Sequence, residues 1–410
     1  MPRILFLIED VSFRTDSRVR RQTSALRKVG AEMIVICPAF EGESDHDLEN
    51  GIHIYRYKKP SMGDGFSAHI AEYATSLLQH TRLTAKVFRK HGFDVIHVAN
   101  PPDILWMVAL PYKVLFKKKF IFDQHDIIPE LFQVRYADKF KMVEPLVLAM
   151  EKMSYKLADH VIVTTESFRQ AAMRRGGRKP EDITIVRNGP RLTLDFPKVD
   201  PDPKTRALAP IMVGYVGHMN PQDHLEKFME MARIIRKEKG RTDIGFVMNG
   251  AGDSWEGLKQ MRDEWGLTDA VLMPGRIPWE NVLSNLAATD ICVQPDPPTA
   301  FNRLLAHNKL MEYMAMGKAC VAFDMEETRV SGDDCVVYVP GEDARDLAEA
   351  VIKLADDKAR REELGRRSRK RIEDVLCWEK QAHWLLEVYQ QLFPGEIATT
   401  QVTYDGTEGR

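Results

Sequence analysis

Side chains that could bind an anion are concentrated in the stretch 302–329. A polar loop leads there into a predicted short helix, 309–316, which should end at Gly317 because glycine tolerates the positive φ of a helix C-cap. The helix start presents free N–H groups and the positive end of the helix dipole, and Lys309 adds a full positive charge there. Glu312 follows one turn later and could accept hydrogen bonds from a ribose diol. This pattern suits anion binding, and the alternative, which the composition alone favours, is an ordinary helix and strand with a solvated Glu312.

Further polar residues follow the predicted strands. Strand and helix patterns alternate along nearly the whole chain, which predicts parallel sheets covered by helices. In open parallel sheets, ligands bind beyond the carboxyl ends of the strands, so we expect the chemistry to depend on residues at these ends. They are Asp10, Asn100, His125, Asn188, Gly217, His218, 250–253, Gly275, Arg276, Pro295, Asp296 and 324–327.

The length and the pattern predict two domains. The chain has 410 residues, of which 44% are hydrophobic, and this is enough for two folded cores. A segment rich in Pro, Asp and Lys, from about 191 to 210, is typical of an interdomain linker. We therefore expect a first domain over 1–195 and a second over 208–376. We expect residues 377–393 to form a closing amphipathic helix. Residues 394–410 have little apolar content and are expected to form a tail.

The composition excludes several classes of protein. The formal net charge is −2 at pH 7, so no overall basic field favours nucleic acid. No apolar run is long enough to span a bilayer, and the first one is too soon followed by Glu9 and Asp10 to be a signal peptide. The five cysteines are scattered without a CxxC pair, which indicates a cytoplasmic, reducing setting without a structural zinc site.

Two Asp-x-Asp pairs have the spacing of metal ligands. They are Asp45 with Asp47 and Asp200 with Asp202. The first pair falls in a polar loop and the second in the predicted linker, so neither lies at a strand end of the second domain. We therefore expect no catalytic metal.

Two arginines near the start of the first predicted helix could bind an anion. Arg18 and Arg21 lie on one face at helical spacing, and Ser17 could cap the helix. The arginines could hold a phosphate or an anionic acceptor. The alternative is that each is an ordinary arginine paired with an acid.

Histidine follows a buried strand in the stretch 123–130, Asp-Gln-His-Asp-Ile-Ile-Pro-Glu. A lone histidine at such a position is more often structural than catalytic. His97 lies inside another predicted strand, and we expect it to be a core histidine whose hydrogen bonds are satisfied. In the second half, 250–253 (Gly-Ala-Gly-Asp) stands between a strand and a helix, but it lacks the third glycine of a dinucleotide fingerprint.

Two surfaces combine lysines with apolar side chains. Such surfaces could bind anionic lipid head groups at roughly 1 kcal/mol per cation, which would place the protein at the inner face of the membrane. The alternative for the first surface is a lysine-rich helix end before a strand. The first comprises Lys113, Leu115, Phe116 and 117–119, and the second Tyr136, Lys139, Phe140 and Lys141.

Three stretches together resemble one known family: 308–318 (Asn-Lys-Leu-Met-Glu-Tyr-Met-Ala-Met-Gly-Lys), 123–130 and 214–223. With 93–103 they are similar to segments of the retaining glycosyltransferases of family 4 (glycosyltransferase group 1), in the branch that handles bacterial polysaccharides. The resemblance extends from residue 3 to about residue 392. It implies the GT-B fold, an α/β architecture of two Rossmann-like domains with parallel sheets facing across a cleft, and a C-terminal helix that returns to the first domain.

The resemblance also implies roles for individual residues. Glu312 would bind the nucleotide ribose and His125 would reach the donor sugar, so these two are the candidate catalytic residues. The candidates for acceptor or phosphate contact are Arg18, Arg21, Asn100 and Asp126. The full set implied for donor binding is Gly217, His218, Gly250, Gly252, Arg276, Ile277, Arg303, Asn308, Lys309 and Glu312.

The sequence departs from the family pattern at three ligand positions. The position of a second glutamate near the donor sugar is Leu304 here. An arginine and a lysine that many relatives place on the diphosphate are replaced by His218 and Asp223. A leaving diphosphate develops charge that must be neutralised. The remaining candidates for this work are Arg276, Arg303 and Lys309.

The implied activity is transfer of a sugar from a UDP- or GDP-sugar to a glycan, lipid-linked or small-molecule acceptor, with retention at the anomeric carbon. Retention in this family is thought to need no protein nucleophile, and neither a metal nor a further cofactor is expected. Two alternatives stay open: a sugar-nucleotide 2-epimerase of the same fold, and a non-catalytic protein that binds nucleotide sugars. The altered positions 218, 223 and 304 are the best support for the second.

Overall fold

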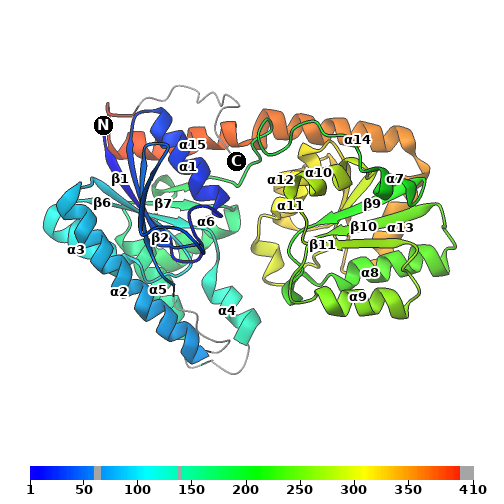
Figure 1. The fold of residues 1–410 in the computed structure, drawn as a ribbon, viewed down its shortest axis with the longest axis horizontal. Helices are drawn as coiled ribbons and strands as arrows, with labels where there is room; N and C mark the ends of the chain where they lie inside the picture. The colour runs from blue at the N-terminus through cyan, green and yellow to red at the C-terminus, as the bar shows by residue number, and fades with distance from the viewer. Residues whose placement is uncertain (60–65, 137–140, 142, 398–410) are drawn as a thin grey trace. The chain divides into compact units, whose positions relative to one another are not determined.

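The computed structural model describes residues 1–59, 66–136, 141 and 143–397. The chain forms two compact units (Figure 1). Unit 1 comprises residues 1–188 and the segment that begins at Gln381, and unit 2 comprises residues 189–380. The chain therefore passes between the units twice, at Asn188–Gly189 and at Lys380–Gln381. We call these two positions the crossing points.

Unit 1 is built on an eight-stranded sheet in the order β3-β4-β2-β1-β5-β6-β7-β8. Neighbouring strands pair in parallel, except that β3 pairs antiparallel with β4. The strands are β1 (Arg3–Leu7), β2 (Glu32–Pro38), β3 (His46–Glu49), β4 (Ile52–Tyr57), β5 (Val95–Ala99), β6 (Lys119–Gln124), β7 (His160–Val163) and β8 (Ile183–Ile185). The helices are α1 (Ser17–Lys28), α2 (Phe66–Lys90), α3 (Trp106–Phe116), α4 (Ile128–Tyr136), α5 (Glu144–Leu157), α6 (Glu166–Gly176), the 3-10 helix η2 (Pro180–Asp182) and α15 (Trp378–Leu392).

Unit 2 contains a six-stranded sheet in the order β11-β10-β9-β12-β13-β14, in which all pairs are parallel. Its strands are β9 (Ile211–Val216), β10 (Ile244–Asn249), β11 (Val271–Gly275), β12 (Ile291–Gln294), β13 (Ala319–Phe323) and β14 (Val336–Val339). Its helices are α7 (Pro203–Ala207), η3 (Pro221–Asp223), α8 (Glu226–Arg233), η4 (Ile234–Glu238), α9 (Trp255–Glu264), α10 (Trp279–Ala287), η5 (Asn302–Leu304), α11 (Asn308–Ala315), α12 (Glu326–Gly332), α13 (Ala344–Asp356), α14 (Lys358–Arg371) and η6 (Ile372–Leu376).

The strands form because apolar runs can be buried on both faces of a parallel sheet. In β13, Ala319, Val321 and Phe323 belong to one core cluster, and Cys320 and Ala322 to another. The same alternation holds for β12, where each successive side chain points to the opposite face. The predicted alternation of strands and helices is confirmed in both units.

The predicted linker is part of unit 2. Residues 203–207 form α7, whose Thr205 hydroxyl donates to Asn285 Oδ1 at 2.8 Å, while Arg206 pairs with Asp290 at 2.6 Å. These contacts fix the segment against α10 and the loop before β12. Within this segment, Asp202, Pro203 and Lys204 form the cap and the first turn of α7.

The cap of α1 differs from the prediction. Asp16, not Ser17, is the N-cap residue, and its carboxylate accepts a hydrogen bond from Val19 N at 2.9 Å. A carboxylate is favoured at this place because it also complements the positive end of the helix dipole.

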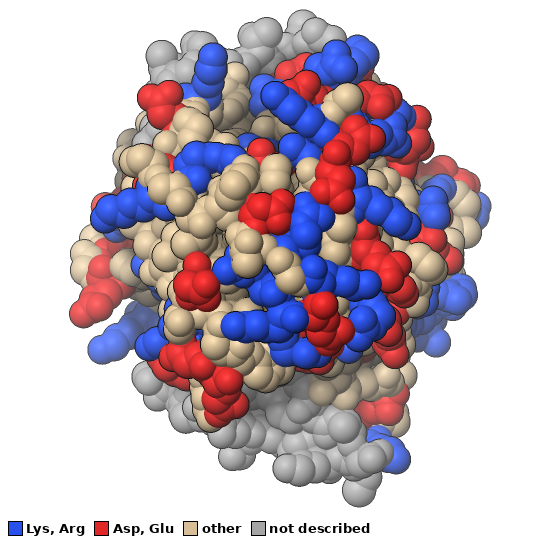
Figure 2. All heavy atoms as spheres, turned by 90° about the vertical axis from the view of Figure 1, so that its right-hand side faces the viewer, with Lys and Arg blue, Asp and Glu red and all other residues tan. Residues whose placement is uncertain are grey.

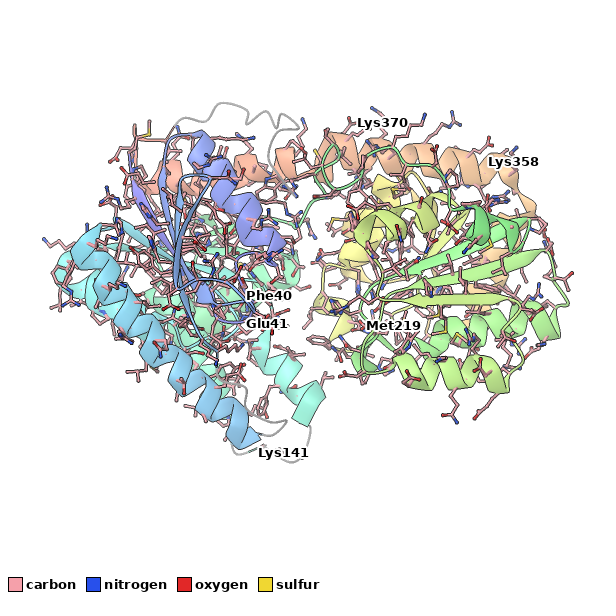
Figure 3. The ribbon with its side chains drawn as sticks, in the orientation of Figure 1. Phe40, Glu41, Lys141, Met219, Lys358 and Lys370 are labelled. Carbon is pink, nitrogen blue, oxygen red and sulfur yellow. The ribbon has the colours of Figure 1, made fainter. Side chains whose placement is uncertain are left out.

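Charges of both signs alternate over the face of unit 2 that Figure 2 shows. On α14, Lys358 and Lys370 point into solvent (Figure 3) and lie one helical turn from acids, Lys370 2.8 Å from Asp374. Such exposed pairs add little stability.

Candidate functional site

Helix α11 is fixed against the carboxyl end of the central strand β9. Its residues Leu310 and Tyr313 are fully buried. The Tyr313 hydroxyl accepts a hydrogen bond from Val216 N at 3.0 Å and lies 3.3 Å from Val216 O. Gly317 ends the helix with a φ of 66°, as predicted. The first turn of α11 thus lies at the edge of the sheet where a ligand is expected.

The Lys309 ammonium forms an ion pair with a buried carboxylate. Its Nζ lies 2.8 and 3.0 Å from the two oxygens of Asp296, which follows β12, and 3.8 Å from Asp223 Oδ1. Asp296 also accepts from the Gln294 amide at 2.7 Å. Two carboxylates therefore outnumber the single positive charge that we predicted at the start of this helix.

Burial and charge oppose each other in this cluster. Burial is the largest effect on Asp296 and raises its pKa, but the charge of Lys309, the His307 ring and the hydrogen bonds from Lys309 and Gln294 together outweigh burial and hold that pKa below its usual range. Burial is also the largest effect on Asp223, and there it prevails, so the pKa of Asp223 is raised. For Lys309, burial lowers the pKa, but the neighbouring carboxylates outweigh burial and raise it. Lys309 and Asp296 are therefore both charged near neutral pH.

The loops after β9 and β10 approach so closely that only glycine fits. A Cβ at Gly250 would lie 1.9 Å from Gly217 O, and a Cβ at Gly252 would lie 2.5 Å from Met219 O. Met219, labelled in Figure 3, is fully buried, and its N–H donates to Ala251 O at 3.2 Å. These glycines have a packing reason that is independent of any ligand, and their part in donor binding stays a prediction.

Other predicted donor residues follow the ends of β9 and β11. His218 is exposed, and its carbonyl accepts a hydrogen bond from the Tyr215 hydroxyl at 2.9 Å. Arg276 is exposed directly after β11. Its neighbour Ile277 is half-buried and packs against the core. The backbone of this turn is therefore held while the guanidinium faces solvent.

The remaining predicted donor residues lie in η5 and in α11. Asn308 is exposed at the first position of α11, and Glu312 is half-buried in the middle of that helix. Arg303 is exposed, and its Nε donates to Pro298 O at 3.0 Å. Leu304, at the place of the family's second glutamate, ends η5. An apolar side chain there cannot hydrogen-bond a sugar hydroxyl.

In unit 1, Asp123 accepts hydrogen bonds from several side chains at once. Arg18 donates to its two oxygens from Nε at 3.1 Å and from Nη2 at 2.7 Å. Gln22 Nε2 donates to Oδ2 at 2.7 Å, and His125 Nε2 donates to the same oxygen at 2.9 Å. His97 Nε2 lies 3.3 Å from it. We call these five residues the Asp123 cluster.

Arg18 is buried in this cluster. Its Nη1 also donates to Val186 O and to Asn188 Oδ1, both at 2.8 Å. Arg21 is buried as well, and its Nε donates to Ser17 O at 2.9 Å. This arrangement favours the alternative of arginines engaged within the protein over a contact with a phosphate or an acceptor.

Asn100 organises the loop that carries His125. Its Oδ1 accepts from the N–H of His125 at 2.6 Å and from that of Asp126 at 3.1 Å, and its Nδ2 donates to Asp103 Oδ1 at 2.8 Å. The amide of Asn100 therefore fixes the backbone after β6 rather than reaching out to an acceptor. The His125 side chain is 17% exposed, so one edge of the ring is open to a ligand.

His97 is buried in the core, as predicted, but among the described residues only its Nδ1 has a hydrogen-bond partner, so its hydrogen bonds are not all satisfied. Its ring stacks on Phe6 with centroids 4.1 Å apart, and its Nδ1 lies 2.7 Å from the Tyr389 hydroxyl of α15. Burial lowers its pKa and keeps it neutral, although Asp123 acts in the opposite direction.

Of the two acids at the centre of these clusters, Asp296 was among the strand-end residues on which we expected the chemistry to depend, whereas Asp123 was given no role of its own. Each stands at or just after the end of a buried apolar strand. A single charge in that position must find a partner in the fold. That signal was available in the sequence, but the partner of each acid was not.

The acids of the two Asp-x-Asp pairs serve the fold. Asp47 lies in β3, not in a loop, and pairs with the buried Arg56 at 2.6 Å. Asp202 is the N-cap of α7 and accepts from Thr205 N at 2.7 Å. Among the residues that the structure describes, no group of three or more His, Cys, Asp or Glu could hold a metal ion.

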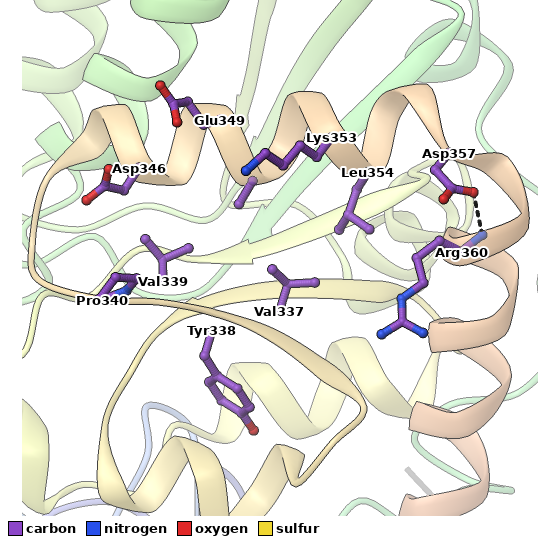
Figure 4. A pocket seen from close by; sticks show the side chains of 11 residues that line it. Val337, Tyr338, Val339, Pro340, Asp346, Glu349, Lys353, Leu354, Asp357 and Arg360 are labelled. Carbon is purple, nitrogen blue, oxygen red and sulfur yellow. Dashed lines mark hydrogen bonds between the residues drawn. The ribbon is translucent and has the colours of Figure 1, made fainter.

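A hollow of about 410 Å³ lies between β14 and α13 (Figure 4). Its lining combines Val337, Tyr338 and Leu354 with the charged Glu349 and Lys353. Its lining residues include none of the predicted site residues. The candidate site is therefore defined by the strand ends and not by this hollow.

Family models match most of the chain. Residues 17–194 match the model described as Glycosyltransferase Family 4, and residues 210–357 match the model described as Glycosyl transferases group 1. The first match lies almost wholly in unit 1 and the second in unit 2. A search of curated protein sequences finds no match.

Solved structures share the fold at low sequence identity. Sucrose-phosphate synthase from Thermosynechococcus elongatus superimposes with a TM-score of 0.76 at 19% identity, covering 96% of this chain and 99% of that one. Anabaena HepE in complex with UDP-glucose superimposes with a TM-score of 0.68 at 14% identity, covering 95% of this chain and 100% of that one. WaaG, a glycosyltransferase involved in lipopolysaccharide biosynthesis, superimposes with a TM-score of 0.68 at 14% identity, covering 96% of this chain and 100% of that one. With two parallel-sheet units, two family matches and these neighbours, the chain belongs to the glycosyltransferases of group 1 and family 4 and has the GT-B fold.

Proposed function

We propose that this glycosyltransferase transfers a sugar from a UDP- or GDP-sugar to an acceptor hydroxyl, with retention at the anomeric carbon. The observation that carries the proposal is the attachment of α11 to the ends of β9 and β12 through Tyr313 and Lys309. This attachment supports a role for Glu312, which α11 carries: its carboxylate binds the ribose diol at this edge of unit 2. His125 of unit 1 contacts the donor sugar.

The reaction breaks the bond between the anomeric carbon and the leaving phosphate oxygen. The acceptor oxygen forms the new bond to that carbon on the same face, and its proton passes to the leaving phosphate. The protein then supplies positioning and charge, and no side chain needs to become a covalent intermediate. Donor and acceptor are sufficient, without a metal or a further cofactor.

The diphosphate charge is neutralised by exposed arginines. Lys309 is already engaged by Asp296 and lies near Asp223, so this cluster carries a net negative charge. Arg276 and Arg303 are exposed at the same edge of unit 2, and within the described part of the chain Arg303 uses only its Nε, in a hydrogen bond to Pro298 O. Backbone N–H groups at the start of α11 complete the site.

The acceptor is a glycan or a lipid-linked glycan at an anionic membrane surface. The end of α3 supports this, because Val114 (66%), Leu115 (72%) and Phe116 (50%) are exposed and lie beside Lys117. Two nearby lysines, Lys113 and Lys118, pair with Asp159 and Asp94, which lowers the net charge of this surface. In the second lysine-containing surface, Tyr136, Lys139 and Phe140 fall outside the side chains that the structure describes. Among the described helices, none has the length and apolar character needed to cross a bilayer.

Ligand binding tests the donor first. UDP, GDP and their sugars are added at about 100 times the dissociation constant, where binding should stabilise by roughly 2.7 kcal/mol in a thermal unfolding experiment. UDP-glucose is the first donor to test, because HepE was solved with it. Glu312→Gln should abolish the shift, and Glu362→Gln on the exposed face of α14 should not. No shift with any nucleotide would contradict the proposal.

The product tests the reaction. Proton NMR of the glycoside should show the anomeric configuration of the donor, and an inverted anomer would refute the retaining mechanism. Turnover should persist in EDTA. Conversion of the donor to its 2-epimer without an acceptor would instead identify an epimerase, and tight donor binding without turnover would identify a binding protein.

A further inference from the structure

The Asp123 cluster draws on separate elements of unit 1. Arg18 and Gln22 come from α1, His97 from β5, and His125 from the loop after β6. The carboxylate that they share is fully buried. Arg18, Gln22 and His125 cannot move independently, because all three donate to the same carboxylate, and His97 Nε2 lies 3.3 Å from it.

The Asp123 cluster contacts residues near both crossing points. Arg18 donates to Val186 O and Asn188 Oδ1, immediately before the first crossing point. His97 Nδ1 lies 2.7 Å from the hydroxyl of Tyr389 on α15, the helix that contains the second crossing point.

The two crossing points are themselves joined. Arg187 N donates to Gln381 Oε1 at 3.0 Å on the unit 1 side, and Trp378 N donates to Pro190 O at 3.0 Å on the unit 2 side. A Cβ at Gly189 would lie 2.0 Å from Leu376 O, so the backbone after the first crossing point packs directly against the backbone that precedes α15. A shift of either segment therefore displaces groups that bind Asp123.

The hydrogen bonds fix which ring nitrogens carry protons. Burial raises the pKa of Asp123, but the charge of Arg18 and the histidine contacts outweigh it and hold the pKa well below its usual range. An ionised carboxylate only accepts, so His125 Nε2 carries a proton. The Nε2–H tautomer leaves Nδ1 as a hydrogen-bond acceptor, which suits a sugar hydroxyl rather than a phosphate.

We propose that Asp123 is a positioning residue for His125, and that its hydrogen bonds couple the orientation of the His125 ring to the two crossing points. The consequence for catalysis rests on the proposed function, whereas the ring orientation does not. A buried ion pair that served stability alone would not require the crossing points to influence His125.

The first test reads the ring directly. Nitrogen-15 NMR of histidine-labelled protein should show His125 as the Nε2–H tautomer. Tyr389→Phe and Asn188→Ala remove one hydrogen bond each at the two ends of the cluster, and both should shift the His125 ring nitrogens. Tyr338→Phe, which removes a hydroxyl bonded to Thr328 O in unit 2, should leave them unchanged. An Nδ1–H tautomer, or no shift in either distal variant, would overturn the proposal.

The second test measures turnover. Asp123→Asn should lower kcat by about 10- to 100-fold, because a small misplacement of a catalytic group is costly. Tyr389→Phe and Asn188→Ala should lower kcat by about 2- to 30-fold, with the nucleotide-induced thermal shift retained. If Asp123→Asn fails to fold, the two distal variants decide. Full turnover in both would overturn the coupling. If the wild type transfers no sugar at all, the proposed function fails while the NMR result still decides the positioning role.

Discussion

Replacing Lys309 with methionine would leave Asp296 charged and buried without its cation. The Asp296 side chain is 3% exposed and that of Lys309 is 14% exposed, so water cannot compensate for the lost ammonium. The Gln294 amide at 2.7 Å would remain, and His307 Nδ1 at 3.9 Å would be the nearest group able to gain a charge.

The expected loss is large. Removing one partner of a buried ion pair costs about 3–5 kcal/mol, because the other charge stays desolvated. Asp296→Asn combined with Lys309→Met removes both charges and keeps an acceptor for Gln294. This double variant should be more stable than Lys309→Met alone by at least about 2 kcal/mol. The deficit of Lys309→Met should also shrink at acidic pH, because protonation of Asp296 removes the unpaired charge.

Urea unfolding followed by circular dichroism measures these differences. The two units can unfold separately, so the unit 2 transition is identified as the one that nucleotide raises. Lys358→Met is the matched control, because Lys358 is 80% exposed and lies 3.8 Å from Glu362, and it should change stability by less than about 0.5 kcal/mol. Equal effects of Lys309→Met and Lys358→Met, or a double variant less stable than Lys309→Met, would refute the reasoning.

Three further predictions concern stability. Gly250→Ala should destabilise unit 2 by at least about 1–3 kcal/mol in the same urea titration, because the new Cβ would meet the backbone of Gly217 and the residue has a φ of 138°. Gly257→Ala is the control: this glycine of α9 has open space around it, so the change should stabilise unit 2 slightly. Burial and nearby cations lower the pKa values of His46 and His91 from 6.5, so the unfolded chain binds more protons and unit 1 should lose stability as pH falls below 6.5. This loss of stability at low pH should be smaller in the His91→Phe variant. A pH profile of stability that is the same in the variant as in the wild type would contradict the prediction. Asp202→Ala should cost about 1 kcal/mol through loss of the α7 cap, and an Asp202→Ser control should recover most of it.

The sheets could be predicted from the sequence because their strands are continuous apolar runs. Elements without that signal were missed. β3 is an exposed antiparallel edge strand with little apolar content. α7 and α12 are too short for a helical period to be visible. Asp202 caps α7, and in α12 the Thr328 hydroxyl accepts a hydrogen bond from the N–H of the N-cap residue Met325. Their existence follows from hydrogen bonds that a pattern of hydrophobic residues does not encode.

The candidate site was predictable as a set of strand ends but not as a set of pairs. Asp123 and Arg18 are separated by 105 residues. They meet because β1, β5 and β6 are neighbours in the sheet, and no local pattern gives that order. Lys309 was correctly placed at a helix start, but its partner was hidden because Asp296 stands alone between prolines. Distance along the chain, and not unusual chemistry, limited the prediction.

The two units share one arrangement, a cation at a helix start that pairs with a buried acid at a strand end. Arg18 is the second residue of α1, and Lys309 is the second residue of α11. A cation at a helix start is disfavoured by the helix dipole, by about 0.3–1 kcal/mol at exposed positions. In each unit a buried acid at a strand end, Asp123 or Asp296, overcomes this and fixes the cation. Buried ion pairs give little net stability, since apolar residues of similar volume often do as well. Each pair instead fixes a group at a strand end, His125 in unit 1 and the start of α11 in unit 2.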